Sequence, residues 1–280
     1  MISPRVRIER DAVALHYDEL DHFYRDVWGE HVHHGLWRRG DETREKAVGQ
    51  LAELVAEEAQ IAHGVRVCDI GCGYGATSRL LAVRGAKVTG ITISPAQFAV
   101  ARERQAGNAN PEFVLGDWLE NDLPANSFDA AIAIESSEHM PDISKFFAQA
   151  QRVLRRGGRL VVCAWLSAEK PSRRATRWLL EPICREGRMP FLGSASDYES
   201  LGRLAGFELY SSEDLTASVS RTWPAIVRSL LAKLVTKPRY LNFLVSRHVQ
   251  NSIFALTILR IWVAYKVGAI RYGVFTFVKE

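Results

Sequence analysis

The spacing of apolar residues along the chain predicts an alternation of strands and helices. Short apolar or β-branched runs, typical of strands, recur between stretches in which apolar residues follow a helical period. This order indicates right-handed β-α-β units in a mostly parallel sheet, whose central strands are buried on both faces. The predicted strands lie at 65–70, 87–91, 112–115, 128–134 and 158–165, and the helices between them include 95–105 and 143–154.

Further elements are predicted before and after these five strands. Residues 9–27 place apolar side chains largely on one helical stripe, which predicts a single amphipathic helix, and 42–62 predict a second one. Beyond the fifth strand, a stretch with three prolines leads to a helix and strand at about 197–210. A helical stretch at about 224–268 then precedes a last alternating strand at 272–279.

The whole chain fits one α/β domain with insertions. A hydrophobic content of 47% in 280 residues allows a large core, and the element order predicts a seven-stranded, mostly parallel sheet. We expect an N-terminal helical lid at 1–64, the sheet core at 65–165, and, at 166–280, helical cap insertions together with the last two strands of the same domain.

The net charge of +4 is distributed unevenly. From Leu215 to Lys279 there are ten Lys or Arg and no acid, so a basic and apolar tail follows an acidic front. The chain has no uninterrupted run of 18 apolar residues and no apolar N-terminal stretch of the secretory kind, which predicts a cytoplasmic protein. The four cysteines show neither the CxxC pairing of a metal site nor the dense framework of a disulfide-rich protein. We therefore expect reduced thiols at Cys68, Cys72, Cys163 and Cys184.

The sequence DIGCGYG at 69–75 lies between the first predicted strand and a helix. Glycines in this position let a ligand approach the backbone at the carboxyl edge of a parallel sheet, as in a Rossmann-like fold. Gly71, Gly73 and Ala76 also fit the dinucleotide pattern GxGxxA. However, the acid Asp69 would repel a pyrophosphate, and the second strand ends in GITIS without the acid that grips the ribose of NAD. A cationic nucleoside such as S-adenosylmethionine is favoured.

Four motifs in order resemble those of class I S-adenosylmethionine-dependent methyltransferases: DIGCGYG, GDW, SFDAAIAIESSEHM and LRRGGRLVV. Within that superfamily, GITISPAQ, WGEHVHHGLW and IRYGVFTFVK are similar to the γ-tocopherol methyltransferase group, and more distantly to sterol and mycolic acid cyclopropane-forming enzymes. The resemblance spans nearly the whole chain. It implies a Rossmann-like seven-stranded sheet and S-adenosylmethionine as the cofactor.

This resemblance implies which residues contact the cofactor. Gly71 and Gly73 would lie against its amino-acid part. Thr92 and Gln97 would lie near its ribose, although many methyltransferases have an acid where this chain has Thr92. The other residues implied at the cofactor are Asp117 and Trp118 beside the adenine, and His34 and Gly35 in the lid.

Candidate acid–base residues follow the predicted strand at 128–134, at the sheet edge where ligands bind in such folds. If the methyl acceptor is a phenol or a carbon atom, a proton must leave, and a His or a Glu of raised pKa can accept it. We predict catalytic roles for Glu135, Glu138 and His139. The matching Glu of the similar cyclopropane-forming enzymes lies in the active site, but Glu138 could instead cap a helix beginning near Pro141.

The lid segment contains His31, His33 and His34. No Cys or carboxylate pattern completes a recognised ligand spacing there, so no metal site is predicted. The resemblance instead indicates a lid that closes over the cofactor. Aromatic lid residues would offer π faces to the sulfonium or to an apolar substrate, and the predicted substrate contacts are Tyr17, Tyr24 and Trp28.

The basic tail has three interpretations. Its charges could serve solubility, they could attach the protein peripherally to an anionic membrane, or arginines could bind the diphosphate of a prenyl substrate. The last interpretation names Arg173, Arg174, Arg221 and Arg228, of which Arg173 and Arg221 are predicted substrate contacts. Nucleic acid is not an expected partner, because the basic residues are interrupted by bulky apolar ones.

The predicted function is methyl transfer to a hydrophobic small molecule. The resemblance favours carbon methylation of a prenylated or terpenoid acceptor, such as a prenyl quinol or a prenyl diphosphate. The alternatives are N- or O-methylation of a small natural product and, from another class of protein, non-catalytic isoprenoid or lipid binding.

Overall fold

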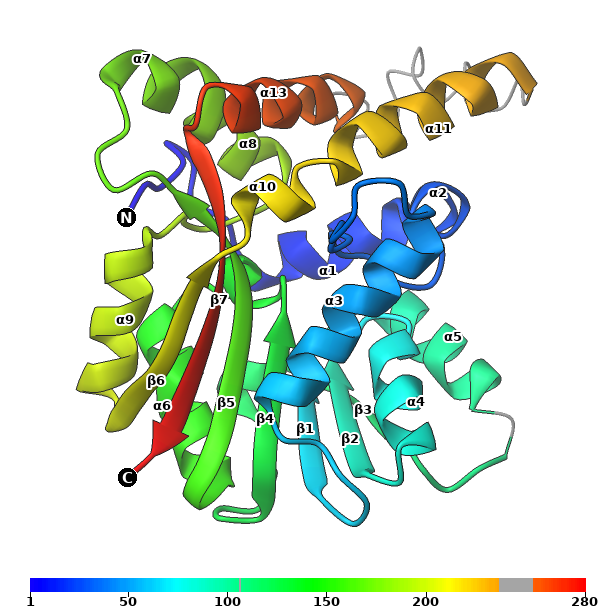
Figure 1. Cartoon of the computed structure of the whole chain (residues 1–280), viewed down its shortest axis with the longest axis vertical. Helices are drawn as coiled ribbons and strands as arrows, with labels where there is room; N and C mark the ends of the chain where they lie inside the picture. Colours follow the sequence, from blue (N-terminus) through cyan, green and yellow to red (C-terminus); the bar gives the residue numbers. More distant parts are fainter. Residues whose placement is uncertain (106, 237–253) are drawn as a thin grey trace.

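The computed structural model describes residues 1–105, 107–236 and 254–280. Its centre is one seven-stranded sheet of order β3-β2-β1-β4-β5-β7-β6 (Figure 1). The first five strands are parallel, whereas β7 runs antiparallel to both β5 and β6. This confirms the predicted Rossmann-like fold class. The strands are β1 (Arg66–Ile70), β2 (Lys87–Thr92), β3 (Glu112–Leu115), β4 (Phe128–Ile134), β5 (Leu154–Ser167), β6 (Phe207–Asp214) and β7 (Ile270–Lys279).

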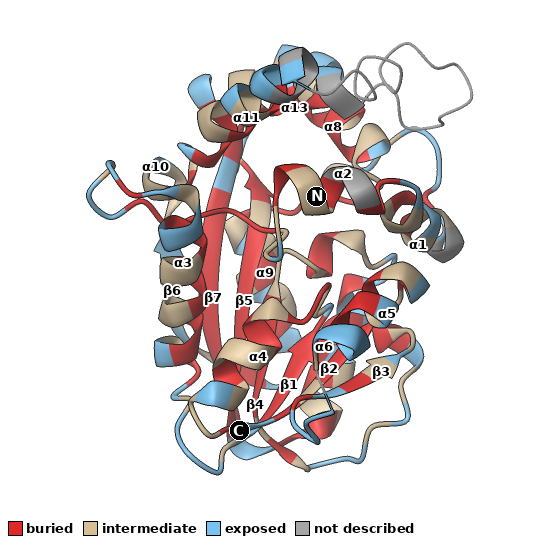
Figure 2. Cartoon of the chain, turned by 90° about the vertical axis from the view of Figure 1, so that its right-hand side faces the viewer, coloured by how far each residue is buried: buried red, intermediate tan, exposed pale blue. Residues whose placement is uncertain are grey.

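Apolar side chains of the central strands are buried on both faces of the sheet, as parallel strands require. In β4, Ala130 and Ile132 enter one hydrophobic core, while Ala131 and Ala133 enter the other. Figure 2 shows the buried strands between helices that are partly exposed. The helices of the first core are α3 (Arg44–Glu58), α4 (Ala76–Val83) and α5 (Pro95–Arg104), and those of the second are α6 (Ile143–Val153) and α9 (Ala195–Leu204).

The lid begins with two helices, α1 (Arg10–Glu19) and α2 (Asp21–Val27), so the predicted single helix over 9–27 is wrong. The chain leaves helical geometry at Leu20, on either side of which carboxylates bind different parts of the core. Asp18 accepts hydrogen bonds from the Ser94 hydroxyl and the Ala96 amide at the start of α5. Asp21 accepts one from the Tyr74 hydroxyl of the glycine loop. These tertiary contacts fix the two helices separately.

Helices of three to fifteen residues form a cap beyond the carboxyl ends of the parallel strands, at the top of Figure 1. The predicted helix over 224–268 consists, in the described residues, of two helices, and its part at 237–253 lies outside them. Within the described ranges, no helix is long and apolar enough to span a bilayer. The cap comprises α7 (Arg173–Ala175), the π-helix η3 (Thr176–Leu180), α8 (Glu181–Glu186), α10 (Thr216–Val219), α11 (Thr222–Thr236) and α13 (Phe254–Lys266).

Candidate active site

The glycine loop lies between β1 and α4 and has a left-handed backbone. Gly71 and Gly73 have φ of +74° and +54°. A Cβ added to Gly71 would lie 2.3 Å from the Cβ of Ser136, whereas a Cβ on Gly73 would meet no atom closer than 3.9 Å. The first glycine therefore permits close packing against the end of β4, and the second leaves open space for a ligand.

Asp69, at the end of β1, supplies the negative charge of the loop. Its Oδ2 accepts a hydrogen bond of 2.6 Å from the Ser78 hydroxyl. Burial raises the pKa of Asp69 to about 6, while this hydrogen bond opposes the rise. Because a nearby cation favours an ionised carboxylate, the site suits the ammonium group of an amino-acid ligand.

A cleft of about 780 Å³, which we name the cofactor cleft, opens above the glycine loop and is lined by the predicted cofactor residues of β2, of α5 and of the segment after β3. Thr92 donates a hydrogen bond to the Gln97 side-chain oxygen at 3.1 Å. The Asp117 carboxylate accepts one from the Leu119 amide and so caps the 3-10 helix η1 (Trp118–Glu120). Gly71, Gly73, Thr92, Gln97, Asp117 and Trp118 all line this cleft.

Trp118 is both a core residue and a wall of the cleft. Its side chain is buried beside Phe146, and its indole N–H donates to the Phe146 carbonyl at 3.2 Å. The part that lines the cleft can meet an adenine by stacking, since an aromatic ring offers an apolar face. The site therefore suits S-adenosylmethionine: the cleft beside Trp118 could hold its nucleoside, and the glycine loop with Asp69 could hold its amino-acid end.

His34 and Gly35 do not line the cofactor cleft, and their contact with the cofactor stays a prediction. His34 lines a second pocket. Gly35 packs against α3, where a Cβ would lie 2.7 Å from the Cβ of Ala47. The lid residues that line the cofactor cleft are Val13, Tyr17 and Val32. Glu30, His31, Val32 and His33 line a smaller cavity beside the glycine loop.

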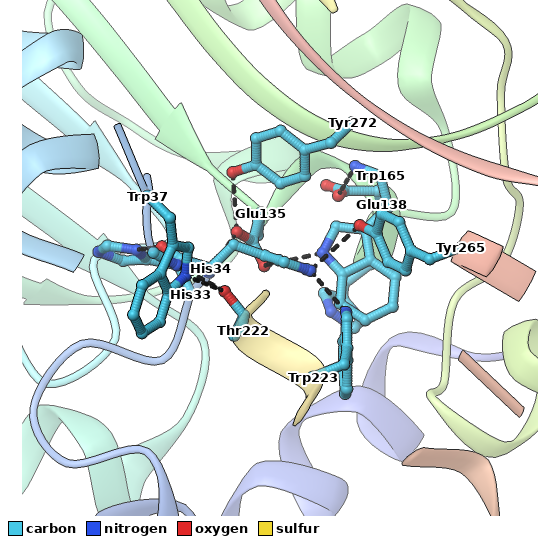
Figure 3. Close-up of polar contacts among 12 residues, drawn as sticks. His33, His34, Trp37, Glu135, Glu138, Trp165, Thr222, Trp223, Tyr265 and Tyr272 are labelled. Carbon is cyan, nitrogen blue, oxygen red and sulfur yellow. Dashed lines mark hydrogen bonds and ion pairs between the residues drawn. The ribbon is translucent and has the colours of Figure 1, made fainter. Parts of the chain in front are cut away.

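Glu135 follows β4 in a left-handed conformation, with φ of +54°, and its carboxylate accepts four hydrogen bonds (Figure 3). The donors are the His34 amide at 2.7 Å, the His34 Nδ1 at 3.0 Å, the Trp165 indole at 2.7 Å and the Tyr272 hydroxyl at 2.8 Å. Burial alone would raise the pKa of Glu135, but His34 lowers it to about 2. A carboxylate held in this way is a poor proton acceptor and fixes the lid to β5 and β7.

His34 connects the lid to the cap. Because its Nδ1 donates to Glu135, its Nε2 is an acceptor, and the Trp223 indole N–H donates to it at 2.9 Å. The Tyr265 hydroxyl also lies 3.1 Å from this nitrogen. Trp223 belongs to α11 and Tyr265 to α13, so one buried histidine holds lid, sheet and cap helices together (Figure 3).

Glu138 lies in the short 3-10 helix η2 (Ser137–His139) and is buried. It accepts hydrogen bonds from the Trp165 amide at 2.7 Å and from the Ser137 hydroxyl at 3.0 Å. Helix α6 is capped by Asp142, so the alternative that Glu138 caps this helix is wrong. Burial raises the pKa of Glu138 to about 8, which gives a carboxyl group that can change protonation near neutral pH.

The raised pKa of Glu138 makes stability depend on pH. Folding favours the protonated acid, so its stabilising contribution is fully present below the unfolded pKa of about 4.5 and is lost as the pH rises towards 8. Glu138→Gln cannot ionise. As the pH rises across this range, the unmodified protein loses this stability and the variant does not. The difference between their free energies of unfolding should therefore shift in favour of Glu138→Gln by on the order of a few kcal/mol.

Urea unfolding at several pH values measures this difference. Glu103→Gln, at an exposed glutamate of α5, is the control and should follow the unmodified protein throughout. Parallel pH curves for Glu138→Gln and the unmodified protein would contradict the raised pKa.

A second pocket of about 660 Å³, which we name the acceptor pocket, lies between lid and cap. It shares Tyr17, Val32, Glu135 and His139 with the cofactor cleft, so the two cavities adjoin. Tyr24 and Trp28, two predicted substrate contacts, line it. The other walls are mostly apolar or aromatic and include Trp165, Ile183, Met189, Trp223 and Ile261.

Arg173 and Arg221 do not line the acceptor pocket, and their contact with the substrate stays a prediction. Arg173 is an exposed residue of α7, and Arg221 donates to the Gly40 carbonyl at 2.9 Å. No Lys or Arg is found among the described residues that line the pocket, and its ionisable acids are Glu135 and Glu138. Clusters of three or more His, Cys, Asp or Glu able to hold a metal ion are missing from the described ranges.

His139 lies where the two cavities meet. Its Nδ1 lies 3.2 Å from the Arg188 carbonyl, which can only accept, so Nδ1 carries the proton. Its Nε2 therefore accepts from the Tyr17 hydroxyl at 3.0 Å. Burial lowers the pKa of His139, although the Arg188 carbonyl and Glu135 oppose this shift. A neutral imidazole whose acceptor nitrogen is hydrogen-bonded to Tyr17 thus faces the junction.

Fold and site together define a class I S-adenosylmethionine-dependent methyltransferase. A family model described as "Methyltransferase domain" matches residues 68–162. Tocopherol O-methyltransferase of Arabidopsis thaliana is 30% identical over 288 residues, covering 95% of this chain and 81% of the relative. 2-Methyl-6-phytyl-1,4-hydroquinone methyltransferase of Synechocystis is 30% identical over 300 residues, covering 100% and 91%. The chain belongs to the tocopherol methyltransferase group of this class.

The fold is also similar to that of a cyclopropane synthase from Mycobacterium tuberculosis. That structure has a TM-score of 0.83 at 22% identity and covers 98% of this chain and 100% of its own. The predicted resemblance, the enzyme class and the cofactor are confirmed by these comparisons.

Proposed function

We propose that this enzyme methylates a ring carbon of a hydrophobic prenylated phenol or hydroquinone. The observation that carries this proposal is an apolar, aromatic acceptor pocket that meets the cofactor cleft at His139. Aromatic walls suit a flat ring and a prenyl chain. The Arabidopsis and Synechocystis relatives, a tocopherol and a phytyl-hydroquinone methyltransferase by name, support the same class of acceptor.

A neutral acceptor fits the pocket better than a prenyl diphosphate. The ionisable acids of the lining are Glu135 and Glu138, and the described lining has no Lys or Arg to neutralise a diphosphate. Burying an unpaired anion beside a carboxylate is strongly unfavourable. Of the two acceptors expected from the sequence, the prenyl quinol is therefore the one we propose.

His139 would accept the proton of the acceptor hydroxyl. The bound cofactor supplies an electrophilic methyl group on a positively charged sulfur. Once the acceptor hydroxyl replaces the Tyr17 hydroxyl at Nε2 of His139, this nitrogen would take the phenolic proton and so increase the electron density of the neighbouring ring carbon, which receives the methyl group. The hydrogen of that carbon would then leave to solvent as a proton, and the imidazolium of His139 would return its proton to the oxygen and restore the phenol. The aromatic walls would hold the ring facing the cofactor cleft.

Incubation with S-adenosylmethionine and a panel of acceptors tests the proposal. The panel contains prenylated hydroquinones, phenols without a prenyl chain, and prenyl diphosphates, and mass spectrometry detects the methylated product. We expect product from the prenylated hydroquinones, with NMR showing a ring methyl group. Turnover confined to the diphosphates would overturn the proposal.

Oxygen methylation is the second candidate, because the Arabidopsis relative is named an O-methyltransferase. The same deprotonation by His139 would make the phenolic oxygen the nucleophile. A methoxy signal in the NMR spectrum of the product would establish it over ring methylation.

We further propose that the cap contacts an anionic membrane, from which such an acceptor would be drawn. Trp178 in η3 and Leu259 in α13 are exposed, and η3 contacts α13. The inner sides of α11 and α13 contribute Trp223 and Ile261 to the acceptor pocket. Exposed basic residues flank this apolar surface at Arg174, Arg177 and Lys266, and such a combination favours anionic lipid surfaces.

Co-sedimentation with phosphatidylglycerol vesicles at low salt tests the membrane contact. The double variant Trp178→Glu/Leu259→Glu should lose most of its binding, because charges would replace the inserted apolar groups. Leu204→Glu, at an exposed leucine of α9, is the matched control and should bind as before. No binding of the unmodified protein, or equal loss in the control, would contradict this proposal.

A further inference from the structure

Glu135 lies at the junction of the cofactor cleft and the acceptor pocket. The residues that line both cavities are Tyr17, Val32, Glu135 and His139. A methyl group can pass from the cofactor to the acceptor only where the cavities adjoin, so the sulfur of a bound cofactor belongs near these residues. Of the four, Glu135 is the one acid.

The charge of Glu135 is held by neutral groups. Its four donors are a backbone amide, an imidazole, an indole and a phenol (Figure 3). The imidazole, that of His34, is neutral, because its Nε2 accepts from the Trp223 indole N–H, which can only donate. Among the described residues, neither cavity is lined by a Lys or an Arg. The donors thus keep the carboxylate ionised without cancelling its charge.

The charge of Glu135 reaches the other polar residues of the junction. Burial chiefly raises the pKa of Tyr17, and the charges of Glu138 and Glu135 add to this rise. Burial lowers the pKa of His139, whereas the Arg188 carbonyl and the charge of Glu135 oppose this shift. Because burial raises the pKa of Glu138 to about 8, Glu138 is mostly protonated at pH 7. Glu135 is therefore the acid that makes the junction negative at neutral pH.

The hydrogen-bonding positions of the Glu135 carboxylate are already filled. Oε1 accepts from the His34 amide and the Tyr272 hydroxyl, and Oε2 accepts from the His34 Nδ1 and the Trp165 indole. A carboxylate has about four such positions, so a ligand can meet its charge but gains little from a further hydrogen bond. A sulfonium has no N–H or O–H group and needs only charge from its surroundings. The carboxylate is thus arranged to attract a cation that donates no hydrogen bond.

We propose that Glu135 selects the charged cofactor over the neutral product of the reaction. S-adenosylmethionine has a positively charged sulfur, whereas S-adenosylhomocysteine has an uncharged one and the same nucleoside and amino-acid ends. A fixed carboxylate near the sulfur stabilises the first ligand and gives the second no such gain. The enzyme would thereby retain the methyl donor and release the used cofactor. This role concerns the cofactor alone and is independent of which acceptor is methylated.

Titration calorimetry at pH 7 with three ligands tests the proposal without relying on turnover. S-adenosylmethionine is compared with S-adenosylhomocysteine and with sinefungin, which carries an ammonium group in place of the methyl group on sulfur. In Glu135→Gln, the affinity for both charged ligands should fall by roughly 10-fold relative to that for S-adenosylhomocysteine, the size expected of two nearby charges in a partly buried site. A defect in lid closure would instead weaken all three ligands by the same factor.

Control variants remove a donor to Glu135 but retain its charge. Tyr272→Phe and Trp165→Phe each do so, and their relative affinities for the three ligands should equal those of the unmodified protein. The double variant Trp165→Phe/Glu135→Gln removes a donor that would face the new amide, so the charge can be tested even where Glu135→Gln alone does not fold. Compared with Trp165→Phe, it should show the same relative loss of roughly 10-fold.

Two results would overturn the proposal. One is a weakening of all three ligands by one factor when Glu135 is replaced by Gln in either background. The other is a relative loss of the charged ligands in Tyr272→Phe as large as in Glu135→Gln, which would trace the preference to the lid anchor and not to the charge.

Discussion

His139→Gln is expected to lower kcat by about 10²-fold to 10⁴-fold, the range usual for loss of a general base. His139 is held by the Arg188 carbonyl and the Tyr17 hydroxyl at the junction of the two cavities. Glutamine can still accept from Tyr17, but it cannot take a proton near neutral pH. The affinity for S-adenosylhomocysteine should change little, because the amino-acid and nucleoside ends of the cleft are formed by other residues.

The pH dependence distinguishes a base from a residue that only supports the fold. Burial lowers the pKa of His139, so the imidazole is neutral at pH 7 and activity should fall only when acidification protonates it. In His139→Gln, this decrease of kcat at acidic pH should disappear. A variant that retains the acidic decrease, or that loses ligand affinity and kcat in equal proportion, would exclude His139 as the proton acceptor.

Gly71→Ala is expected to destabilise the protein and to abolish most cofactor binding. The residue has φ of +74°, and its Cβ would lie 2.3 Å from the Cβ of Ser136. An L side chain in this conformation costs about 1–2 kcal/mol, and relieving the overlap costs about 1–3 kcal/mol more. Because Ser136 lies two residues after β4, where Glu135 is held by four hydrogen bonds, the glycine loop must move to relieve the overlap, and the cofactor cleft changes shape with it.

A matched glycine separates the two effects. Gly157 has φ of +73°, and a Cβ there would have no atom within 4 Å, so Gly157→Ala carries only the conformational cost. Urea unfolding and titration with S-adenosylhomocysteine should show the larger loss for Gly71→Ala. The double variant Gly71→Ala/Ser136→Gly removes the overlapping Cβ and should recover part of the affinity. Equal effects of Gly71→Ala and Gly157→Ala would show that the close approach is unimportant.

The core of the fold was predictable because its elements follow from local patterns. The strands at 112–115 and 128–134 have the predicted bounds, since an apolar run between turns has few other ways to be buried. The glycine loop was equally predictable, as its spacing and Asp69 describe a local backbone turn and a charge. These features also indicated the cofactor before any tertiary contact was known.

Contacts between distant segments could not be predicted in the same way. Glu135 could be placed after a predicted strand, but the sequence did not show that His34, Trp165 and Tyr272 converge on its carboxylate from the lid, β5 and β7. Leu20 interrupts the first predicted helix, because Asp18 and Asp21 bind different parts of the core. In each case the deciding partners lie far away in sequence.

The sequence by itself determined the sheet, the glycine loop and Asp69, and through them the class of cofactor, because periodicity and backbone geometry act over a few residues. The protonation states of the site residues depend on the tertiary structure alone. Burial outweighs the two donors of Glu138 and leaves it able to titrate, four donors keep Glu135 ionised, and the Arg188 carbonyl fixes the tautomer of His139. Side-chain chemistry of this kind depends on the neighbours that folding brings together.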